Sequence, residues 1–568
     1  MPKPSLMSVA RGDAPADLLL TGGRVVNVFT GELENVDVAL SGASVAGLGP
    51  GYEAAHVLDL EGKFLLPGLI DAHVHIESSM STPREFARAV VPRGTTTVIS
   101  DPHEIANVHG MDGIRYMLEA SEGLPLSVFV MASSCVPATD MGTAGAALGA
   151  EDLRELLSHP RVLGLAEVMN FPGVIFEDPA VLDKLDAFSG RAIDGHAPNV
   201  RGQALNAYVV GGPTSDHEST TPEEALEKIR RGMTVLFREA TNAKNLLDLL
   251  PALTPENRRR VAFCTDDRQP PDLLEKGGID AMVRMAIRNG TPPIEAVRLA
   301  TLNPSDHYRL YDRGGIAPGR RADLLVVDDL EALSIAEVYS GGVKVADGGL
   351  GLPWTLPTPP APPPPSMNVS WEALDLGIAA RSGKVRVIRV IPDQIVTGSE
   401  VATPSVEAGQ VVSDPERDLL KIVVIDRHTE SGRVGAGLVT GMGLKAGAIA
   451  GTVAHDHHNL MAIGVDDTSL LSAARKVGEM GGGLAVARGE DVLCALPLTV
   501  GGLMSEEPIE STKEGLGAIL DATRSLGSPL HDPFMAMSFL GLEVIPSLKL
   551  TDQGLVDVEA FSIVDLWI

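Results

Sequence analysis

The sequence predicts an α/β protein built around a closed (β/α)8 barrel of the TIM type, with a small composite β-sandwich domain and an additional C-terminal α+β domain. Between Pro67 and Thr301, short apolar runs alternate with amphipathic stretches, which is the pattern of a parallel sheet covered by helices. This stretch is close to the roughly 250 residues that such a barrel needs. Polar residues of metal-binding types also follow several of the apolar runs.

Short strands are predicted on both sides of the barrel segment. Apolar runs separated by turn residues between Asp17 and Leu60 indicate a small antiparallel sheet. Two strand-like runs after the barrel, at 322–327 and 343–346, are expected to rejoin this sheet. The resulting division assigns residues 1–66 with 316–352 to the composite β-sandwich domain and residues 67–315 to the barrel.

Within the barrel segment, two strand–helix units are especially clear. The apolar run 97–100 is followed by a helical pattern at 113–118, and the run 127–132 is followed by one at 151–157. Because parallel strands joined by helices all end on the same side, residues that follow these strands are expected to meet at one face.

A proline-rich segment follows the composite domain. Eight prolines stand between Pro353 and Pro365, so we assign residues 353–366 to an extended linker. Residues 367–568 then form a separate α+β unit. It contains strand-like runs at 385–388 and 422–425 and a predicted helix at 470–480.

Composition excludes several classes of partner. Hydrophobic residues make up 44% and charged residues 21% of the chain, as in a globular protein, and the net charge is -29. This charge argues against nucleic acid or an anionic membrane as a partner and favours a small neutral substrate. The three cysteines match no zinc or redox spacing, and no apolar run is long enough to span a bilayer, so we expect a cytoplasmic protein. Enzymes of this size commonly form symmetric dimers or higher homo-oligomers, and we expect the same here.

Two histidines stand two residues apart after the apolar run Leu69-Ile70. Residues i and i+2 of a strand point to the same side, so His73 and His75 can bind one ion or one half of a two-ion centre. A chance pair on a half-exposed strand is the alternative. The Pro67-Gly68 turn before the run and the polar residues after it favour the metal site.

Further polar side chains follow apolar runs downstream. Taken singly, each has a plain explanation as a solvated loop residue or a helix cap. Together with the first pair, and leaving the Asp101 segment aside, they supply four imidazoles and two carboxylates, a set that suits Zn, Mn or Fe. The positions are His73, His75, Asp101 with His103, Glu167, His196, His217 and Asp266.

The segments around these positions resemble the adenine deaminase family of the amidohydrolase superfamily. The likeness covers nearly the whole chain, including the run His455-Asp456-His457-His458-Asn459. Ser219, where many members have a cysteine, is a small departure, and the proline-rich linker matches least well. The segments that carry the resemblance are His73–Met80, Gly94–Val108, Asp194–Pro198 and Ser215–Glu218.

The resemblance implies a metal-dependent hydrolase barrel with a binuclear divalent metal centre, with Mn²⁺ preferred and Fe²⁺ or Zn²⁺ as alternatives. Glu167 would bridge the two ions, and Asp266 would bind the first ion and accept a proton from the attacking water. The histidines would bind in pairs, His73 with His75 on the first ion and His196 with His217 on the second.

Many amidohydrolases bridge their metals with a carbamylated lysine instead of a glutamate. The barrel lysines of this sequence lie in charged, helix-like stretches, so Glu167 is the preferred bridge. These lysines are Lys184, Lys228, Lys244 and Lys276.

The activity implied by the resemblance is hydrolysis of adenine to hypoxanthine and ammonia, a reaction of purine salvage. Metal-activated water would attack C6, and an acid must protonate N1 and then the leaving amine. The candidate acids are Glu77, His103 and Glu239; Glu77 has a helix cap or the support of a ligating histidine as its alternative role. Asp101 is expected to orient a ligating histidine.

A second histidine group lies far from the barrel in sequence. His455, His457 and His458 follow a strand-like run, and with Asp101 they are candidates for an accessory metal site or, as a group, for a lid over the barrel. A solvated polar turn would have the same appearance.

Two other functions are open on these residues. Another cyclic amidohydrolase, acting on hydantoin or dihydroorotate, would use the same metals, but the long deaminase-like segments argue against it. A metal-binding paralogue without catalysis is the second alternative, and the presence of all six proposed ligands argues against that.

Overall fold

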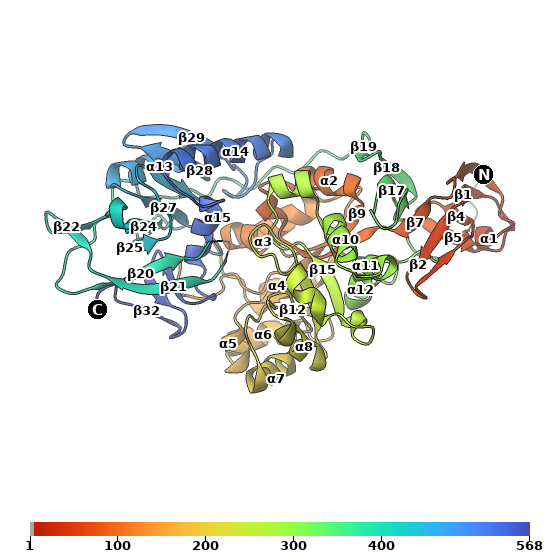
Figure 1. Ribbon diagram of the computed structural model, residues 1–568, viewed down its shortest axis with the longest axis horizontal. Helices are drawn as coiled ribbons and strands as arrows, with labels where there is room; N and C mark the ends of the chain where they lie inside the picture. Colours follow the sequence, from red (N-terminus) through yellow and green to blue (C-terminus); the bar gives the residue numbers. More distant parts are fainter. Residues whose placement is uncertain (1–4, 393) are drawn as a thin grey trace.

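Eight parallel strands in the middle of the chain form a barrel. In Figure 1 this part of the molecule lies between the N-terminal strands and the C-terminal domain. The protein is described here from a computed structural model, which describes residues 5–392 and 394–568. Residues 1–4 of the expected N-terminal domain lie outside the described part. Five of the barrel strands form one parallel sheet in the order β12-β11-β10-β9-β8, and three form a second in the order β13-β14-β15.

Backbone hydrogen bonds join these two sheets into one barrel. The amide of Thr214 donates to the carbonyl of Ile193 at 2.8 Å, next to β13, and the amide of Asp266 donates to the carbonyl of His73 at 3.0 Å, next to β15. The barrel strands are β8 (Leu69–Val74), β9 (Thr95–Ser100), β10 (Ser127–Ala132), β11 (Val162–Val168), β12 (Ala192–Gly195), β13 (Ser215–Asp216), β14 (Thr234–Arg238) and β15 (Val261–Cys264). The predicted barrel is therefore confirmed.

Helices surround the barrel, as the alternating pattern predicts. Strand β8 is buried at every position, because the barrel interior covers one face and helices cover the other. The longer helices lie between successive barrel strands in the chain or follow the last of them. They are α2 (Pro83–Val90), α3 (His103–Ala120), α4 (Ala150–Leu156), α6 (Pro179–Ala187), α7 (Gly202–Gly211), α8 (Pro222–Arg230), α10 (Ile279–Arg288), α11 (Pro293–Leu299) and α12 (Leu302–His307).

The segments on either side of the barrel share a sheet. Strand β7 (Phe64–Pro67) enters the barrel, and it pairs antiparallel with β16 (Leu324–Val327), which follows it. The sheet that contains β7 and β16 has seven strands, in the order β19-β18-β17-β16-β7-β2-β3. A four-stranded sheet of order β5-β4-β1-β6 packs against it through a common apolar core. The remaining strands of the pair are β1 (Ala16–Thr21), β2 (Arg24–Asn27), β3 (Glu32–Glu34), β4 (Val38–Ser41), β5 (Ser44–Leu48), β6 (Ala54–Asp59), β17 (Ile335–Ser340), β18 (Val343–Asp347) and β19 (Leu350–Gly351).

One prediction about this region is wrong. The strands between Asp17 and Leu60 do not form one antiparallel sheet, because β1 pairs with β6 in parallel and β2 and β3 belong to the other sheet. The apolar inner face of each short strand must be buried against other strands. Packing between the two sheets determines which strands pair, and a local sequence pattern does not reveal this packing.

The C-terminal domain is built on an eight-stranded sheet with an apolar core on each face. In β24 (Leu420–Ile425), Ile422 and Val424 belong to one core, while Val423 and Ile425 belong to the other. Helix α13 (Asp467–Glu479) covers one face; helix α14 (Ile509–Ser525) and a three-stranded sheet pack on the other. The other strands of the eight are β20 (Val385–Val390), β21 (Thr397–Ala402), β25 (Val434–Thr440), β26 (Ala448–Gly451), β27 (Leu460–Gly464), β28 (Gly483–Arg488) and β29 (Asp491–Pro497), and the small sheet contains β30 (Leu548–Thr551), β31 (Gly554–Asp557) and β32 (Ser562–Val564).

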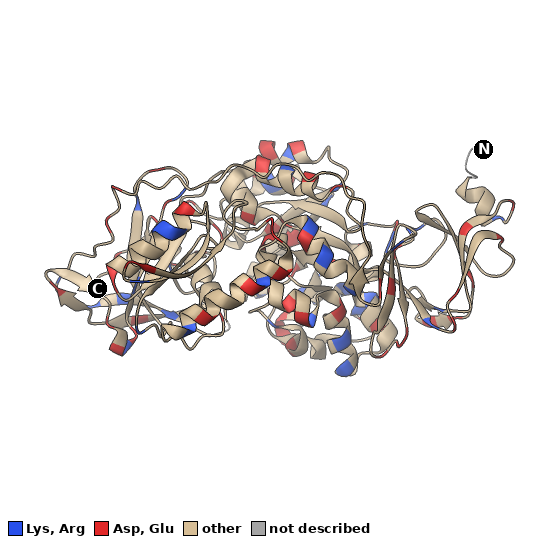
Figure 2. Cartoon of the chain, turned by 90° about the horizontal axis from the view of Figure 1, so that it is seen from above, with Lys and Arg blue, Asp and Glu red and all other residues tan. Residues whose placement is uncertain are grey.

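Charged residues of both signs lie along the helices. Figure 2 shows acidic and basic residues interspersed on them, and pairs such as Arg115 with Asp112, 3.0 Å apart, join opposite charges on one helix. Among the helices of residues 5–392 and 394–568, we find none that combines the length and the apolar character needed to cross a lipid bilayer.

Candidate metal centre

Six predicted ligands meet at the C-terminal end of the barrel. Each lies in the last residues of a barrel strand or in the first residues after it, so the parallel arrangement brings them to one face. His73 Nε2 and His75 Nε2 lie 3.1 Å apart, and Asp266 Oδ1 is 3.4 Å from the first and 3.1 Å from the second. The structure thus brings together residues that are nearly 200 positions apart in sequence.

Glu167 lies between two pairs of histidines. Its Oε1 is 3.2 Å from His75 Nε2 and 3.7 Å from His73 Nε2. Its Oε2 is 2.6 Å from His196 Nδ1 and 3.1 Å from His217 Nε2. One carboxylate therefore faces both groups of imidazole nitrogens, each with a different oxygen.

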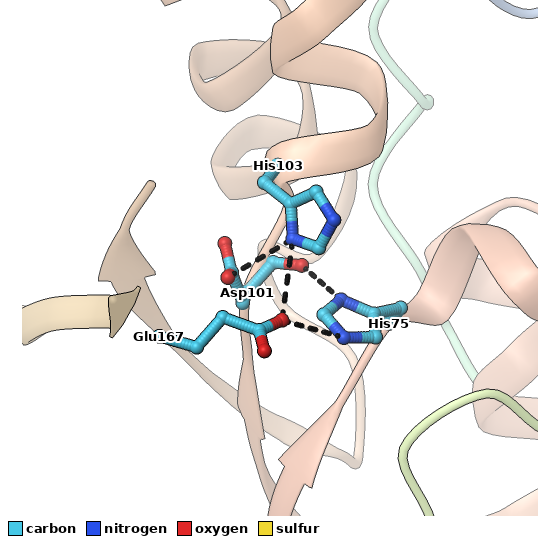
Figure 3. Close-up of side chains that lie close together, drawn as sticks. All are labelled: His75, Asp101, His103 and Glu167. Carbon is cyan, nitrogen blue, oxygen red and sulfur yellow. Dashed lines mark hydrogen bonds and ion pairs between the residues drawn. The ribbon is translucent and has the colours of Figure 1, made fainter. Parts of the chain in front are cut away.

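A second layer of contacts orients His75 (Figure 3). Its Nδ1 donates to the backbone carbonyl of Asp101 at 2.9 Å, which fixes the ring with Nε2 directed at the centre. The Asp101 carboxylate accepts from His103 Nδ1 at 3.1 Å and from Ser133 at 2.9 Å. Asp101 thus contacts His75 through its backbone and His103 through its side chain.

Asp266 is held by an arginine that the sequence analysis did not single out. Arg238 Nη1 lies 3.0 Å from Asp266 Oδ2, and both of its terminal nitrogens bind Glu218. Burial opposes ionisation of Asp266, but hydrogen bonds from His73 and His75 and the charge of Arg238 keep its pKa well below the usual value. The carboxylate is therefore ionised at neutral pH.

The carboxylates of the site are ionised and stabilise positive charge beside them. Burial would raise the pKa of Glu167, yet His217 and His196 hold it well below the ordinary value. Burial would also lower the pKa of His75, but hydrogen bonds with Asp266 and Glu167 raise it well above the ordinary value. Ionised carboxylates that attract protons onto neighbouring imidazoles attract a divalent cation in the same way.

The donor set fits a divalent metal. In the group His73, His217 and Asp266, and in the group Glu167, His196 and His217, the ligand atoms lie within 4.8 Å of one another and the residues are buried. Imidazole nitrogen with carboxylate oxygen is a set that first-row transition metals accept.

Three of the four barrel lysines are engaged away from this centre: Lys184 donates to the carbonyl of Ser134 at 2.7 Å, and Lys276 pairs with Asp272 at 2.6 Å. Lys228, which the sequence predicts in a charged helical stretch, is fully buried in α8. Its ammonium group is paired with Asp216 and Glu224, each at 2.8 Å. These contacts occupy the amine that a carbamylated bridge would need.

The three candidate acids lie in different places. His103 lines the cavity above the centre, and its Nδ1 is 3.6 Å from Glu167 Oε1. Glu77 is buried below the cavity wall, where its Oε1 accepts from the amide of Ile105 in the first turn of α3 at 3.3 Å, and burial raises its pKa to about 7. Glu239 is buried too, but it is absent from the lining of the cavity. Only His103 of the three therefore faces the space where a substrate would sit.

The C-terminal histidines separate into two groups. His455 Nδ1 lies 2.7 Å from Glu104 Oε1, and His458 Nε2 contacts the other oxygen of Glu104. His457 faces away, with Nε2 3.5 Å from Glu543 Oε1. Because His458 Nδ1 accepts from the amide of Ala454, its Nε2 carries the proton and donates to Glu104. These contacts favour a hydrogen-bonded cluster over a solvated turn.

Both domains line the cavity above the metal ligands. The lining includes barrel residues from five of the six predicted ligand positions and seven residues of the C-terminal domain. The barrel side is polar, and most of the wall from the C-terminal domain is apolar. The residues from the C-terminal domain are Ile395, His455, Asp456, Met535, Phe539, Leu542 and Ile545.

Several residues of this cavity were not assigned a role from the sequence. Glu104 and Glu218 each follow a predicted histidine, and Asp267 follows Asp266, so their positions beside metal-binding types were the available signal. Arg238 carried a different signal, a charged residue at the end of a strand of otherwise apolar character. The apolar wall from the C-terminal domain left no comparable signal.

Comparisons with known proteins agree with these features. Residues 64–345 match the sequence model of the amidohydrolase family, and residues 394–562 match that of the adenine deaminase C-terminal domain. An adenine deaminase of Desulfatibacillum aliphaticivorans is 52% identical over 564 residues, covering 99% of each chain. One of Oleidesulfovibrio alaskensis is 47% identical over 99% of this chain and 98% of that one, and adenine deaminase 2 of Carboxydothermus hydrogenoformans is 47% identical over 99% of each.

Proposed function

This chain belongs to the adenine deaminase family of amidohydrolases, and from that premise we propose that it hydrolyses adenine to hypoxanthine and ammonia. The observation that carries the proposal is the convergence of four imidazoles and two carboxylates beneath one cavity. The apolar wall of this cavity suits the faces of an aromatic ring.

We propose that the centre holds two divalent ions, with Mn²⁺ preferred over Fe²⁺ and Zn²⁺. The two oxygens of Glu167 support this, because each faces a different pair of histidines. His73, His75 and Asp266 would hold the first ion, and His196 with His217 the second. When bound, a divalent ion lowers the pKa of its water toward neutrality and so supplies a nucleophile.

The protein's own groups handle the protons of the reaction. Asp266 is ionised and faces the centre, so its carboxylate is the group proposed to accept the proton of the attacking water. His103 is proposed to protonate N1 of the ring, because it lines the cavity and its Nδ1 is engaged by Asp101, which leaves Nε2 as the donor. Burial would lower the pKa of His103, but Asp101, Glu104 and Asp456 raise it well above its usual value, so the ring carries the proton.

The apolar residues over the cavity exclude water during the reaction. Phe539 and Met535 of the C-terminal domain pack with Met169 of the barrel in one apolar cluster. This closes the centre from above and strengthens the electrostatic contacts inside it. The C-terminal domain is therefore proposed to be part of the active site.

Product analysis tests the proposed function. Purified protein loaded with Mn²⁺ should convert adenine into equal amounts of hypoxanthine and ammonia, followed by chromatography and an ammonium assay. Dihydroorotate and hydantoin serve as comparison substrates in parallel. Turnover of either cyclic amide with none of adenine would replace the proposal with a cyclic amidohydrolase.

A cytoplasmic location and a homo-oligomeric state stay predictions. The three cysteines, Cys135, Cys264 and Cys494, are free thiols, which is compatible with a reducing compartment.

A further inference from the structure

A turn of the C-terminal domain reaches into the barrel mouth. His455 and Asp456 follow β26, and both line the cavity opposite the metal ligands. They stand beside His103 and Glu104 of the barrel, about 350 residues away in sequence. This turn therefore brings new polar atoms to the substrate space.

Asp456 has a carboxylate without a hydrogen-bond partner. Its side chain is only 3% exposed, and Oδ2 contacts no donor among the described residues. Oδ1 is 3.7 Å from His103 Nε2 and 3.9 Å from His455 Nδ1, both beyond hydrogen-bond distance. His455 Nε2 is also buried without a partner. Since burying a carboxylate without a donor is costly, these atoms indicate a partner that binds in the cavity.

The position of Asp456 relative to the metal ligands defines what that partner must be. The imidazole of His103 lies between the two sites, with Nδ1 3.6 Å from Glu167 and Nε2 3.7 Å from Asp456. A flat heterocycle lying beside this ring reaches the metal ligands with one edge and Asp456 with the opposite edge. The edge that faces Asp456 must carry a donor, because a carboxylate only accepts.

Resting on the proposed function, we propose that Asp456 binds the imidazole N–H of a free purine base and thereby selects the base over its nucleosides. With C6 of adenine at the metal ligands, the five-membered ring points toward Asp456. A free base carries one N–H on this ring, whereas a base substituted at N9 carries none. A nucleoside in the cavity would leave the buried carboxylate without a hydrogen-bond donor, and a site built around a hydrogen bond discriminates strongly against a ligand that lacks it.

Binding of two product-like ligands tests the role of Asp456. The dissociation constants of hypoxanthine and 9-methylhypoxanthine are measured by titration calorimetry on the full-length, Mn²⁺-loaded protein. The wild type should favour hypoxanthine. In Asp456→Asn, which keeps the size of the side chain, this preference should fall by roughly tenfold or more, because a hydrogen bond to a charged group is lost. Asp456→Ala should show at least the same loss.

A matched control separates this role from a general effect on the domain. Glu543 is buried in the same domain, and its Oε2 also has no partner among the described residues, but it is absent from the cavity lining. Glu543→Gln should leave the preference unchanged. An Asn variant that keeps the wild-type preference, or that weakens both ligands equally, would overturn the inference. A wild type that binds neither base would instead count against the proposed function.

Discussion

Replacing Glu167 with glutamine should disable the metal centre while leaving the barrel intact. The carboxylate lies 2.6 Å from His196 Nδ1, 3.1 Å from His217 Nε2 and 3.2 Å from His75 Nε2. Glutamine keeps the shape but replaces one oxygen with an amino group. Whichever oxygen is lost, one pair of imidazoles then faces an N–H donor in place of an anionic ligand, so one of the two proposed ions loses its bridge.

The size of the effect follows from this geometry. Mutating a partner that only supports a metal ligand costs about 10- to 100-fold, so loss of a shared ligand should cost at least about 100-fold in kcat/KM, or about 2.7 kcal/mol. The assay combines adenine turnover with metal content per chain, which should fall by one ion. Glu224→Gln is the matched control, since Glu224 is a buried barrel carboxylate 2.8 Å from Lys228 and does not line the cavity. It should keep its metal content. Full activity and full metal content in Glu167→Gln would refute the bridging role.

Three further predictions address positioning and stability. Arg238→Lys should lower kcat/KM by about 10- to 100-fold with normal metal content, because a lysine has no planar fork that could bind Asp266 and Glu218 together. Unchanged kinetics would count against this. Gly164→Ala should lower the thermal midpoint, since a Cβ there would come 2.0 Å from the backbone oxygen of Ala192, and overpacking costs about 1–3 kcal/mol. An unchanged midpoint would show that β11 and β12 can move apart to accommodate the methyl group. Burial lowers the pKa of Lys549 to about 7, so between about pH 7 and 10.5 the unfolded chain binds a proton that the folded chain does not. The free energy of unfolding of the wild type should therefore rise with pH in this window, relative to Lys549→Met, by up to about 1.4 kcal/mol per pH unit. Parallel pH profiles of the thermal midpoint for the two proteins would contradict this.

Residues at strand ends could be located from the sequence because the barrel makes a local pattern sufficient. His73 and His75 follow an apolar run at the spacing of one strand face, and every barrel strand delivers its last residues to the same side. The sequence pattern does not show whether Arg238 or Glu239 faces the centre. Adjacent residues of a strand point to opposite sides, and only the closed barrel shows that Arg238 faces the centre.

Long-range contacts set the limit of the sequence analysis. Asp456 meets His103 across about 350 residues, and the parallel pairing of β1 with β6 depends on packing between two sheets. Neither contact has a period or spacing in the sequence. The histidines around Asp456 drew attention to this segment, but the pattern gave no sign that the carboxylate between them is buried without a hydrogen-bond partner.

Metal dependence of adenine turnover tests the central claim most directly. The protein is stripped with a chelator, Mn²⁺ is added back in steps, and the ultraviolet spectrum of adenine is followed at each step. We predict no conversion without metal and a rise in the rate of hypoxanthine formation that ends at two ions per chain. Equal rates before and after reloading, or no conversion by protein that has bound two ions, would contradict the account.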